Sequence, residues 1–226
     1  MTATTAALPQ VECLYDSQPP VIKVEIRRTP FWKRTVDVCG SAFLIVALLP
    51  LFAVISVFIK IVSRGPVLFK QERIGVGTKG FVIYKFRTMT VNDGPDLHRD
   101  YVAQLARSNS QAQKPCYRNR LIYGGALLRA LSLDELPQLF NVLIGNMSLI
   151  GPRPEVLRLE DYQPWQLRRF EVLPGISGLW QVSGKNRLTF KQMIELDIRY
   201  VDNLSLRLDI LIMLKTVKVI LTRSNH

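Results

Sequence analysis

Two adjacent acidic residues, Asp134 and Glu135, are the first side chains of this sequence whose types and spacing could do chemistry. They follow Ser132 and precede Pro137 in the segment SLDELP. One interpretation is purely structural, because Ser132 and Glu135 have the spacing of a capping box at a helix start. Pro137 would then be the fifth helical residue, where it removes a backbone donor and clashes with the preceding turn. We therefore expect the helix to begin near Asp134 or later, with both acids at its mouth.

A helix N-terminus stabilises a carboxylate and attracts phosphate. An ionised Asp134 there is suited to act as a nucleophile or to hold a divalent cation beside a diphosphate. Arg129 lies five residues upstream, and Arg153 lies between two prolines that restrict its backbone, so both could bind phosphate. Lys85 and Arg87 are two residues apart and would share one face of a strand. Each alone is typical of a solvated basic residue, and only their combination indicates a site.

The elements that must position these residues belong to a chain of unusual composition. It has 226 residues, enough for one domain or two small ones, with 48% hydrophobic and 21% charged residues. That is too apolar for an ordinary soluble enzyme and too charged for a bundle of membrane spans, so it favours a membrane-attached globular protein. The net charge of +12 favours anionic partners such as phospholipid headgroups, nucleotides or nucleic acid. Three scattered cysteines and two histidines exclude a disulfide framework and a multi-histidine metal site.

An uncharged run of 22 residues, 38–59, is just long enough to cross a bilayer as a straight helix. Pro50 lies in its middle, where it should kink a helix. Basic residues on both sides would keep both ends in the cytoplasm by the positive-inside rule. These residues are Arg27, Arg28, Lys33 and Arg34 before the run, and Lys60 and Arg64 after it. Composition alone leaves two alternatives, a kinked single span and a re-entrant helix over residues 31–62.

The other segments are assigned from periodicity and turn signals. Residues 1–30 lack sustained periodicity and predict a flexible N-terminal arm. Short strands at 67–69 and 81–86, joined through a glycine turn, open a domain that extends over residues 63–226. Residues 204–222 are apolar but carry four charges, which favours an interfacial helix over a span, with a core helix as the alternative. Patterning alone predicts a mixture of α and β structure.

Five segments resemble the bacterial sugar transferase family, the monotopic phosphoglycosyl transferases that begin glycan assembly on a polyprenyl phosphate. They are KRTVDVCGSAFLIVALLPLF, GPVLFKQERIG, FVIYKFRTM, LLRALSLDELPQLFNVLIGNMSLIGPRP and PGISGLWQVSGKNRLTF. They occur in this order between residues 33 and 190, so the resemblance is highly specific.

The resemblance implies that a sugar 1-phosphate passes from a UDP-sugar to undecaprenyl phosphate, with release of UMP. It implies Mg²⁺ and a covalent aspartyl-phosphosugar intermediate, with Asp134 as the nucleophile and Glu135 as its partner. Both acids are candidate magnesium ligands. Arg129 and Arg153 match the phosphate-contacting arginines of the family. The product would begin the synthesis of an exopolysaccharide, a capsule or a related glycan, and no residue indicates which sugar is transferred.

For the basic motif and the membrane helix the resemblance has further implications. Lys85 and Arg87 belong to the motif YKFRTM, and Pro50 matches the proline that breaks the family's re-entrant helix, which favours re-entry over a span. The implied fold is a compact α+β monotopic membrane protein with a small cytosolic globular domain and amphipathic surface helices. It would lie on the cytosolic face of the bacterial inner membrane and bind UDP-sugar, undecaprenyl phosphate and phospholipids. An apolar face left uncovered by lipid would indicate a homodimer.

Two hypotheses from other classes predict different observations. A membrane-anchored nucleic-acid-binding protein should expose aromatic side chains among its basic residues, whereas Phe81, Tyr84 and Phe86 lie in a strand expected to pack inside. We therefore expect no nucleic-acid partner. A scaffold without catalysis would not need the full set of acidic residues and arginines, and it would tolerate loss of Asp134.

Overall fold

The computed structural model of the chain describes residues 24–90, 102–104, 120–184 and 187–222. Strands β1 (Leu68–Ile74) and β2 (Gly80–Phe86) form an antiparallel ribbon, and β3 (Ser148–Ile150) pairs in parallel with β4 (Gly175–Ser177). The longer helices are α1 (Phe31–Ala47), α2 (Leu49–Val62), α4 (Gly125–Ala130), α5 (Gln138–Ile144), α6 (Phe190–Asp202) and α7 (Leu206–Leu221). The short 3₁₀ helices are η1 (Val76–Thr78), η3 (Leu133–Glu135), η4 (Leu159–Asp161), η5 (Pro164–Glu171) and η6 (Trp180–Val182). This mixture of helices and separate small sheets is α+β, as expected.

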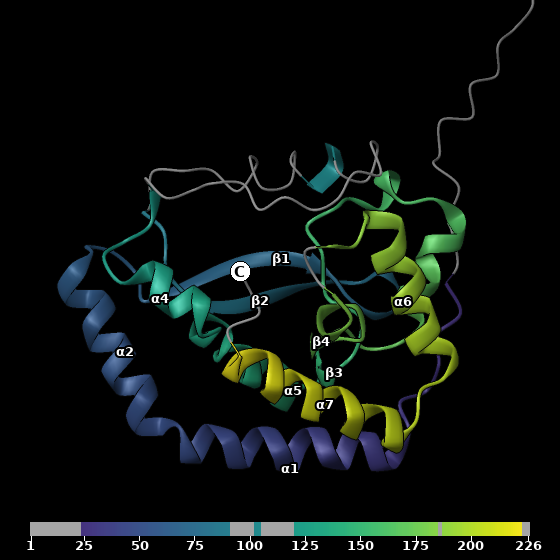
Figure 1. Cartoon of the computed structure of the whole chain (residues 1–226), viewed down its shortest axis with the longest axis horizontal. Coiled ribbons are helices and arrows are strands. Elements are labelled where there is room, and N and C mark those ends of the chain that lie inside the picture. Colours follow the sequence, from purple (N-terminus) through teal and green to yellow (C-terminus); the bar gives the residue numbers. More distant parts are fainter. Residues whose placement is uncertain (1–23, 91–101, 105–119, 185–186, 223–226) are drawn as a thin grey trace, which may run out of the picture.

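Helices α1 and α2 form a bent pair at the base of the domain. Figure 1 shows α1 along one edge of the molecule and α2 turning away from its end. The two axes are bent by 61° at Leu48, and Pro50 lies in the first turn of α2. Pro50 has no backbone N–H with which to continue the hydrogen bonding of α1, which accounts for the predicted break. Of the helices that the structure describes, none alone is long and apolar enough to cross a membrane, whereas the bent pair together is.

A buried ion pair joins the first turn of α1 to α7. Lys33 Nζ lies 2.6 Å from Asp209 Oδ2 in α7 and donates to the carbonyl oxygen of Ile150 at 2.9 Å. Tyr200 of α6 donates to Asp209 Oδ1 at 2.7 Å. The sequence predicts that Lys33 belongs to the basic flank of a membrane segment. The structure instead places it inside the protein, where it joins α1, β3 and α7.

Two further side chains of α1 bind the domain. Arg34 donates to the carbonyl oxygens of Val142 and its successor at 2.8 and 2.9 Å, at the C-terminal end of α5, where the helix dipole favours a cation. Asp37 Oδ1 accepts from Ser148 Oγ at 2.9 Å and from the Leu149 N–H at 2.8 Å, at the start of β3. The polar face of α1 therefore packs on the domain, which leaves apolar residues such as Phe43 on its exposed side.

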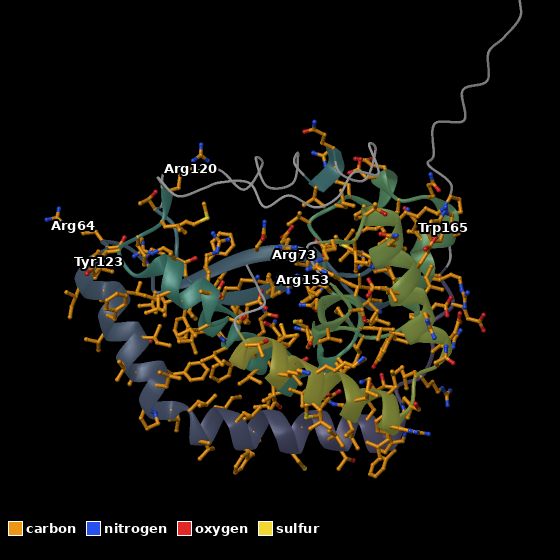
Figure 2. All side chains as sticks on the ribbon, viewed as in Figure 1. Arg64, Arg73, Arg120, Tyr123, Arg153 and Trp165 are labelled. Carbon is orange, nitrogen blue, oxygen red and sulfur yellow. The ribbon has the colours of Figure 1, made fainter. Side chains whose placement is uncertain are left out.

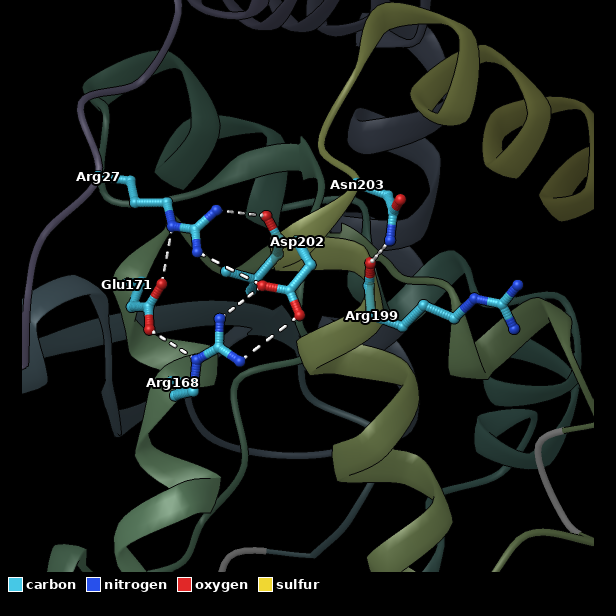
Figure 3. Close-up of polar contacts among 7 residues, drawn as sticks. Arg27, Arg168, Glu171, Arg199, Asp202 and Asn203 are labelled. Atoms are coloured by element: carbon cyan, nitrogen blue, oxygen red, sulfur yellow. Dashed lines mark hydrogen bonds and ion pairs between the residues drawn. The ribbon is translucent and has the colours of Figure 1, made fainter.

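The segment just before α1 also contacts the domain. Arg27 bridges Glu171 of η5 and Asp202 of α6, and Arg168 bonds the same two acids, so that the four side chains form one surface network (Figure 3). The Arg27 N–H also donates to the Glu171 carbonyl oxygen at 2.8 Å. Residues 1–23 of the predicted arm lie outside the described residues. The part from residue 24 to 30 differs from the prediction, because these bonds hold it against the domain.

The strands β1 and β2 are joined as predicted, through a turn in which Gly77 has a φ of +60°. The first strand is longer than expected, since it continues to Ile74 instead of ending at residue 69. Its run of charged and polar residues hides the alternation by which a strand is identified. Phe86 of β2 is 2% exposed and packs with Ile55 and Ile59 of α2, as expected for an aromatic residue of the core.

Helix α7 combines the two alternatives left open by its sequence. Ile212 is fully buried, and Asp209 forms the ion pair with Lys33, so one face belongs to the core. Apolar side chains on the remaining surface are exposed, as an interfacial helix requires. These are Leu206, Ile210, Leu211, Met213, Leu214 and Val217. The charge of Asp209 therefore lies on the core side of the helix.

Asn141 of α5 binds the outer edge of β2 and gives a test of this packing. The fully buried side chain accepts from the Tyr84 N–H at 3.1 Å and donates to the Val82 carbonyl oxygen at 2.6 Å. Asn141→Ala leaves both backbone groups without these partners, and we expect a loss of about 3 kcal/mol of stability. Thermal unfolding in detergent should show a decrease in Tm of roughly 10 °C.

Asn203 provides the matched control, because its side chain is exposed and bonds one carbonyl oxygen, that of Arg199 (Figure 3). Asn203→Ala should change the Tm by no more than about 3 °C. An Asn141→Ala variant that unfolds at the wild-type temperature would show that α5 does not need this contact with the strand.

Candidate active site

The acidic pair lies on a 3₁₀ turn between α4 and α5. Ser132 has a φ of +56° and makes no side-chain cap, so the chain has no capping box here. Asp134 and Glu135 lie in η3, and α5 begins at Gln138, directly after Pro137. The expected late helix start is thus confirmed, because Pro137 precedes the helix and does not interrupt it.

Glu135 is the centre of a compact charged cluster. Lys85 Nζ from β2 lies 2.8 Å from its Oε1, and Arg153 NH2 lies 2.7 Å from the same atom. Arg153 NH1 is 3.4 Å from Oε2, so the guanidinium faces the carboxylate with both of its terminal nitrogens. The three side chains come from η3, β2 and the loop after β3, which the fold brings together. Figure 2 shows Arg153 in the middle of the molecule, beside the ribbon of β1 and β2.

The two acids have opposite electrostatic environments. Burial by itself would raise the pKa of Glu135, but Arg153 and Lys85 hold this pKa well below its ordinary value. Burial raises the pKa of Asp134, and the neighbouring charge of Glu135 raises it further, against the opposing effect of Lys85. Glu135 therefore stays ionised, while Asp134 is the more basic carboxylate of the pair.

Asp134 has the properties of a reactive group rather than a structural one. It is 9% exposed, and its carboxylate makes no hydrogen bond to the residues that the structure describes. Its oxygens keep their lone pairs for another atom, in contrast to Glu135, whose Oε1 binds two cations. A desolvated carboxylate beside two cations can attack an electrophile whose negative charge the cations neutralise.

The other two predicted phosphate-binding residues lie apart from the pair of cations at Glu135. Arg129 is exposed in the last turn of α4, and its charge lowers the pKa of Asp134 without a hydrogen bond to either acid. Arg87 donates to the carbonyl oxygens of Arg64 and Ser63, at 2.7 and 2.8 Å. The sequence predicts a common face for Lys85 and Arg87, but β2 ends at Phe86, and the two side chains reach different partners.

Lys85 and Arg87 should accordingly respond differently to substitution. Lys85→Met removes a cation beside Asp134, and we expect kcat/KM to fall by about 10²-fold, as for loss of one charge-stabilising donor. Arg87→Met removes two bonds at the end of α2, and we expect a loss of about 2 kcal/mol of stability. Steady-state kinetics and thermal unfolding of both variants check this. A raised KM with an unchanged Tm in Arg87→Met would assign Arg87 to substrate binding.

The donor set is compatible with a magnesium ion that shares its coordination with a substrate. Among the described residues no group of three or more His, Cys, Asp or Glu side chains could hold a metal. Asp134 offers both oxygens, and Glu135 offers Oε2, which accepts only a long bond of 3.4 Å from Arg153 NH1 among the described residues. Mg²⁺ is usually bound by one or two carboxylates together with substrate phosphates and water, so these two acids fit it.

Several buried residues around the site were not identified from the sequence. Arg73 of β1, Arg169 of η5 and Asp197 of α6 lie within the protein, and Figure 2 shows Arg73 next to Arg153. A basic residue in a polar stretch carries no local signal of burial, so these contacts could not be predicted. Asn141 did carry one, because a polar residue in the apolar segment of α5 indicates a buried polar partner.

Comparison with known proteins gives a consistent result. The family model described as bacterial sugar transferase matches residues 28–223. The chain is 40% identical over 216 residues to the UDP-glucose:undecaprenyl-phosphate glucose-1-phosphate transferase of Caulobacter vibrioides, covering 91% of this chain and 74% of the relative. It is 42% identical over 205 residues to the uncharacterized sugar transferase EpsL of Bacillus subtilis, covering 86% and 92%. A UDP-N-acetylgalactosamine-undecaprenyl-phosphate N-acetylgalactosaminephosphotransferase of Aeromonas hydrophila is 40% identical over 199 residues, which are 85% of this chain and 44% of the relative.

Proposed function

Since the chain belongs to the bacterial sugar transferase family, we propose that it transfers a sugar 1-phosphate from a UDP-sugar to undecaprenyl phosphate and releases UMP. The observation that carries the proposal is the cluster in which Asp134 lies beside Glu135, with Lys85 and Arg153 within 2.8 Å of the Glu135 carboxylate. An acidic group beside two cations suits an electrophile that is itself a diphosphate.

In the first step Asp134 attacks the phosphorus that carries the sugar. A bond forms between a carboxylate oxygen and this phosphorus, and the bond from phosphorus to the bridging oxygen breaks, so that UMP leaves with the electron pair. In the second step a phosphate oxygen of the lipid attacks the same phosphorus and releases the Asp134 carboxylate, which gives undecaprenyl-diphosphate-sugar. A covalent intermediate lets a water-soluble nucleotide and a membrane lipid use one site in turn. The raised pKa of Asp134 supports its role as nucleophile.

Lys85 and Arg153 supply the positive charge that this transfer needs. Phosphoryl transfer depends mainly on positioning and on neutralising charge, and both cations already lie at Glu135 before a substrate binds. We propose that they contact the diphosphate and stabilise the leaving UMP. Glu135 keeps the two cations in place and, because its own pKa is lowered, stays negatively charged.

Magnesium completes the proposed site. Asp134 and the Oε2 atom of Glu135 are the groups that would hold it, together with oxygens of the substrate and water. When bound, it would supply further positive charge to the diphosphate. Arg129 is the remaining cation near Asp134, and we propose that it contributes to phosphate binding from the exposed side.

We further propose that the bent pair of α1 and α2 is a re-entrant membrane helix on the cytosolic face of the inner membrane. The 61° bend and the apolar composition of the pair support this, as do the exposed residues of α7. Polar residues of α1 bind the domain, while Phe43 and Val46 are about 70% exposed. A helix with this distribution can rest in lipid on one side and on protein on the other.

The test is UMP release by detergent-solubilised protein with undecaprenyl phosphate, magnesium and a panel of UDP-sugars. UDP-glucose, UDP-galactose and their N-acetylated counterparts form the panel, since the Caulobacter relative is named for UDP-glucose and the Aeromonas relative for UDP-N-acetylgalactosamine. We expect release with one donor, dependent on lipid and on magnesium. No release with any of these sugars, in the presence of folded protein, would contradict the proposed reaction. Release with one donor would identify the sugar that is attached to the lipid. It would place the enzyme at the first step in the synthesis of a glycan that begins with this sugar.

A further inference from the structure

The loop that carries Arg153 is held by its carbonyl oxygens. Pro152 and Pro154 have no backbone N–H, so the segment has few donors with which to fix itself. Its three successive carbonyl oxygens each accept a bond from a different element. Pro152 O accepts from the Gly175 N–H at 2.9 Å, Arg153 O from Arg169 NH2 at 2.6 Å, and Pro154 O from Arg73 NH1 at 2.9 Å.

The two arginines that hold this loop are themselves fixed inside the protein. Arg169 is 2% exposed, lies 2.7 Å from Asp197 Oδ2, and donates to the Tyr162 hydroxyl at 3.2 Å. Arg73 donates to Gln71 Oε1 at 2.7 Å and is also buried. Neither arginine makes a hydrogen bond to Asp134 or Glu135 among the described residues, so neither belongs to the acidic cluster itself.

Burying these guanidinium groups costs desolvation free energy, which apolar side chains of similar volume would not cost. What the guanidiniums provide is geometry, because each planar group bonds one carbonyl oxygen of the loop and is held by a second partner, Gln71 for Arg73 and Asp197 for Arg169. The carbonyl oxygen of the peptide between Arg153 and Pro154 and that of the following peptide are thereby fixed. The direction in which the Arg153 side chain leaves the backbone is fixed with them.

We propose that Arg169, held by Asp197, and Arg73 are positioning residues that aim the Arg153 guanidinium at Glu135 and at the phosphates of the substrate. This inference rests on the proposed function for its kinetic consequence but not for its structural one. A displacement of about 1 Å in a group that contacts the transition state can cost about 10²-fold in rate.

The kinetic test is a double-mutant cycle on the full chain in detergent. Arg169→Lys keeps a positive charge for Asp197 but loses the planar guanidinium, whose NH2 bonds both Asp197 and Arg153 O while NH1 bonds Tyr162. We expect kcat to fall about 10- to 100-fold, with KM for the UDP-sugar changed less than about threefold. If Arg169 acts through Arg153, the double variant Arg169→Lys/Arg153→Lys should be no slower than Arg153→Lys alone. Losses that multiply would overturn the proposal.

The same cycle with Arg73→Lys gives an independent arm, in case Arg169→Lys does not fold. Leu167→Ala is the matched control, because Leu167 is 2% exposed in the core and on the same element as Arg169 but has no bond to the loop. It should lower the Tm, and its effect on kcat should multiply with that of Arg153→Lys. Non-additivity shared by Leu167→Ala would show that general loosening of the core is responsible, which would overturn the proposal.

A second readout does not depend on turnover. The Nε–Hε resonance of Arg153, assigned by its absence in Arg153→Lys, reports the surroundings of this guanidinium in protein with ¹⁵N-labelled arginine. We expect it to shift or broaden in both Arg169→Lys and Arg73→Lys, and to stay in place in Leu167→Ala. An unchanged resonance in the two arginine variants would overturn the positioning role. If the resonance moves but no UDP-sugar is turned over by wild-type protein, the positioning stands and the proposed function fails.

Discussion

Asp134→Asn is expected to abolish transfer and to lower kcat/KM by about 10³-fold or more, because an amide cannot form the proposed covalent bond to phosphorus. The fold should survive, since the Asp134 carboxylate makes no hydrogen bond within the described part of the chain. UMP release by wild-type and variant protein under the same conditions measures the effect. Equal Tm values for the two proteins would exclude unfolding as the cause.

The covalent step itself is visible by mass. Wild-type protein incubated with the correct UDP-sugar and no lipid acceptor should gain the mass of the sugar phosphate, on the peptide that contains Asp134. Asp202→Asn is the control, because Asp202 is an exposed acid whose ion pairs are with Arg27 and Arg168 and not with the cations of the site (Figure 3). It should retain the mass gain and nearly all activity. UMP release by Asp134→Asn at the wild-type rate would instead indicate direct attack by the lipid phosphate.

Local features of the chain could be predicted because their causes are local. Pro137 excludes a helix across the acidic pair, and Pro50 breaks the apolar segment at the place where the two helices meet. The turn before β2 follows from Gly77 at a positive φ. The ion pair between Lys85 and Glu135, which are 50 residues apart, could not be predicted. The sequence and the family resemblance indicated only that both residues belong to one site.

Contacts between distant segments were not predictable from the sequence, because nothing near a residue indicates its partner. β3 and β4 are three residues each, too short for a period to show, and they pair only because Gly151 and Gly175 allow their backbones to touch. The charge of Lys33 likewise has two interpretations that the sequence alone does not separate. It fits the basic flank of a membrane helix as well as a buried ion pair, and only the position of Asp209 decides between them.

This buried pair is the second place where a large effect is expected. Lys33→Met leaves the Asp209 carboxylate buried without its cation, and removing one partner of such a pair typically costs about 3–5 kcal/mol. Thermal unfolding in detergent should show a decrease in Tm of roughly 10 °C or more. Lys33 also donates to Ile150 O, and Ile150 directly precedes the loop with Arg153. We therefore expect activity to fall in Lys33→Met even at temperatures where the variant is folded.

Two controls separate the loss of this pair from the loss of a surface charge. Arg158→Met removes one partner of an ion pair whose side chains are 59% and 70% exposed, and it should change stability by less than about 1 kcal/mol. Lys33→Met/Asp209→Leu removes both buried charges and should recover part of the stability, because no uncompensated ion remains. A double variant less stable than Lys33→Met would show that Asp209 stabilises the fold chiefly through Tyr200. Helix α1 would then be joined to the rest of the domain mainly by Arg34 and Asp37.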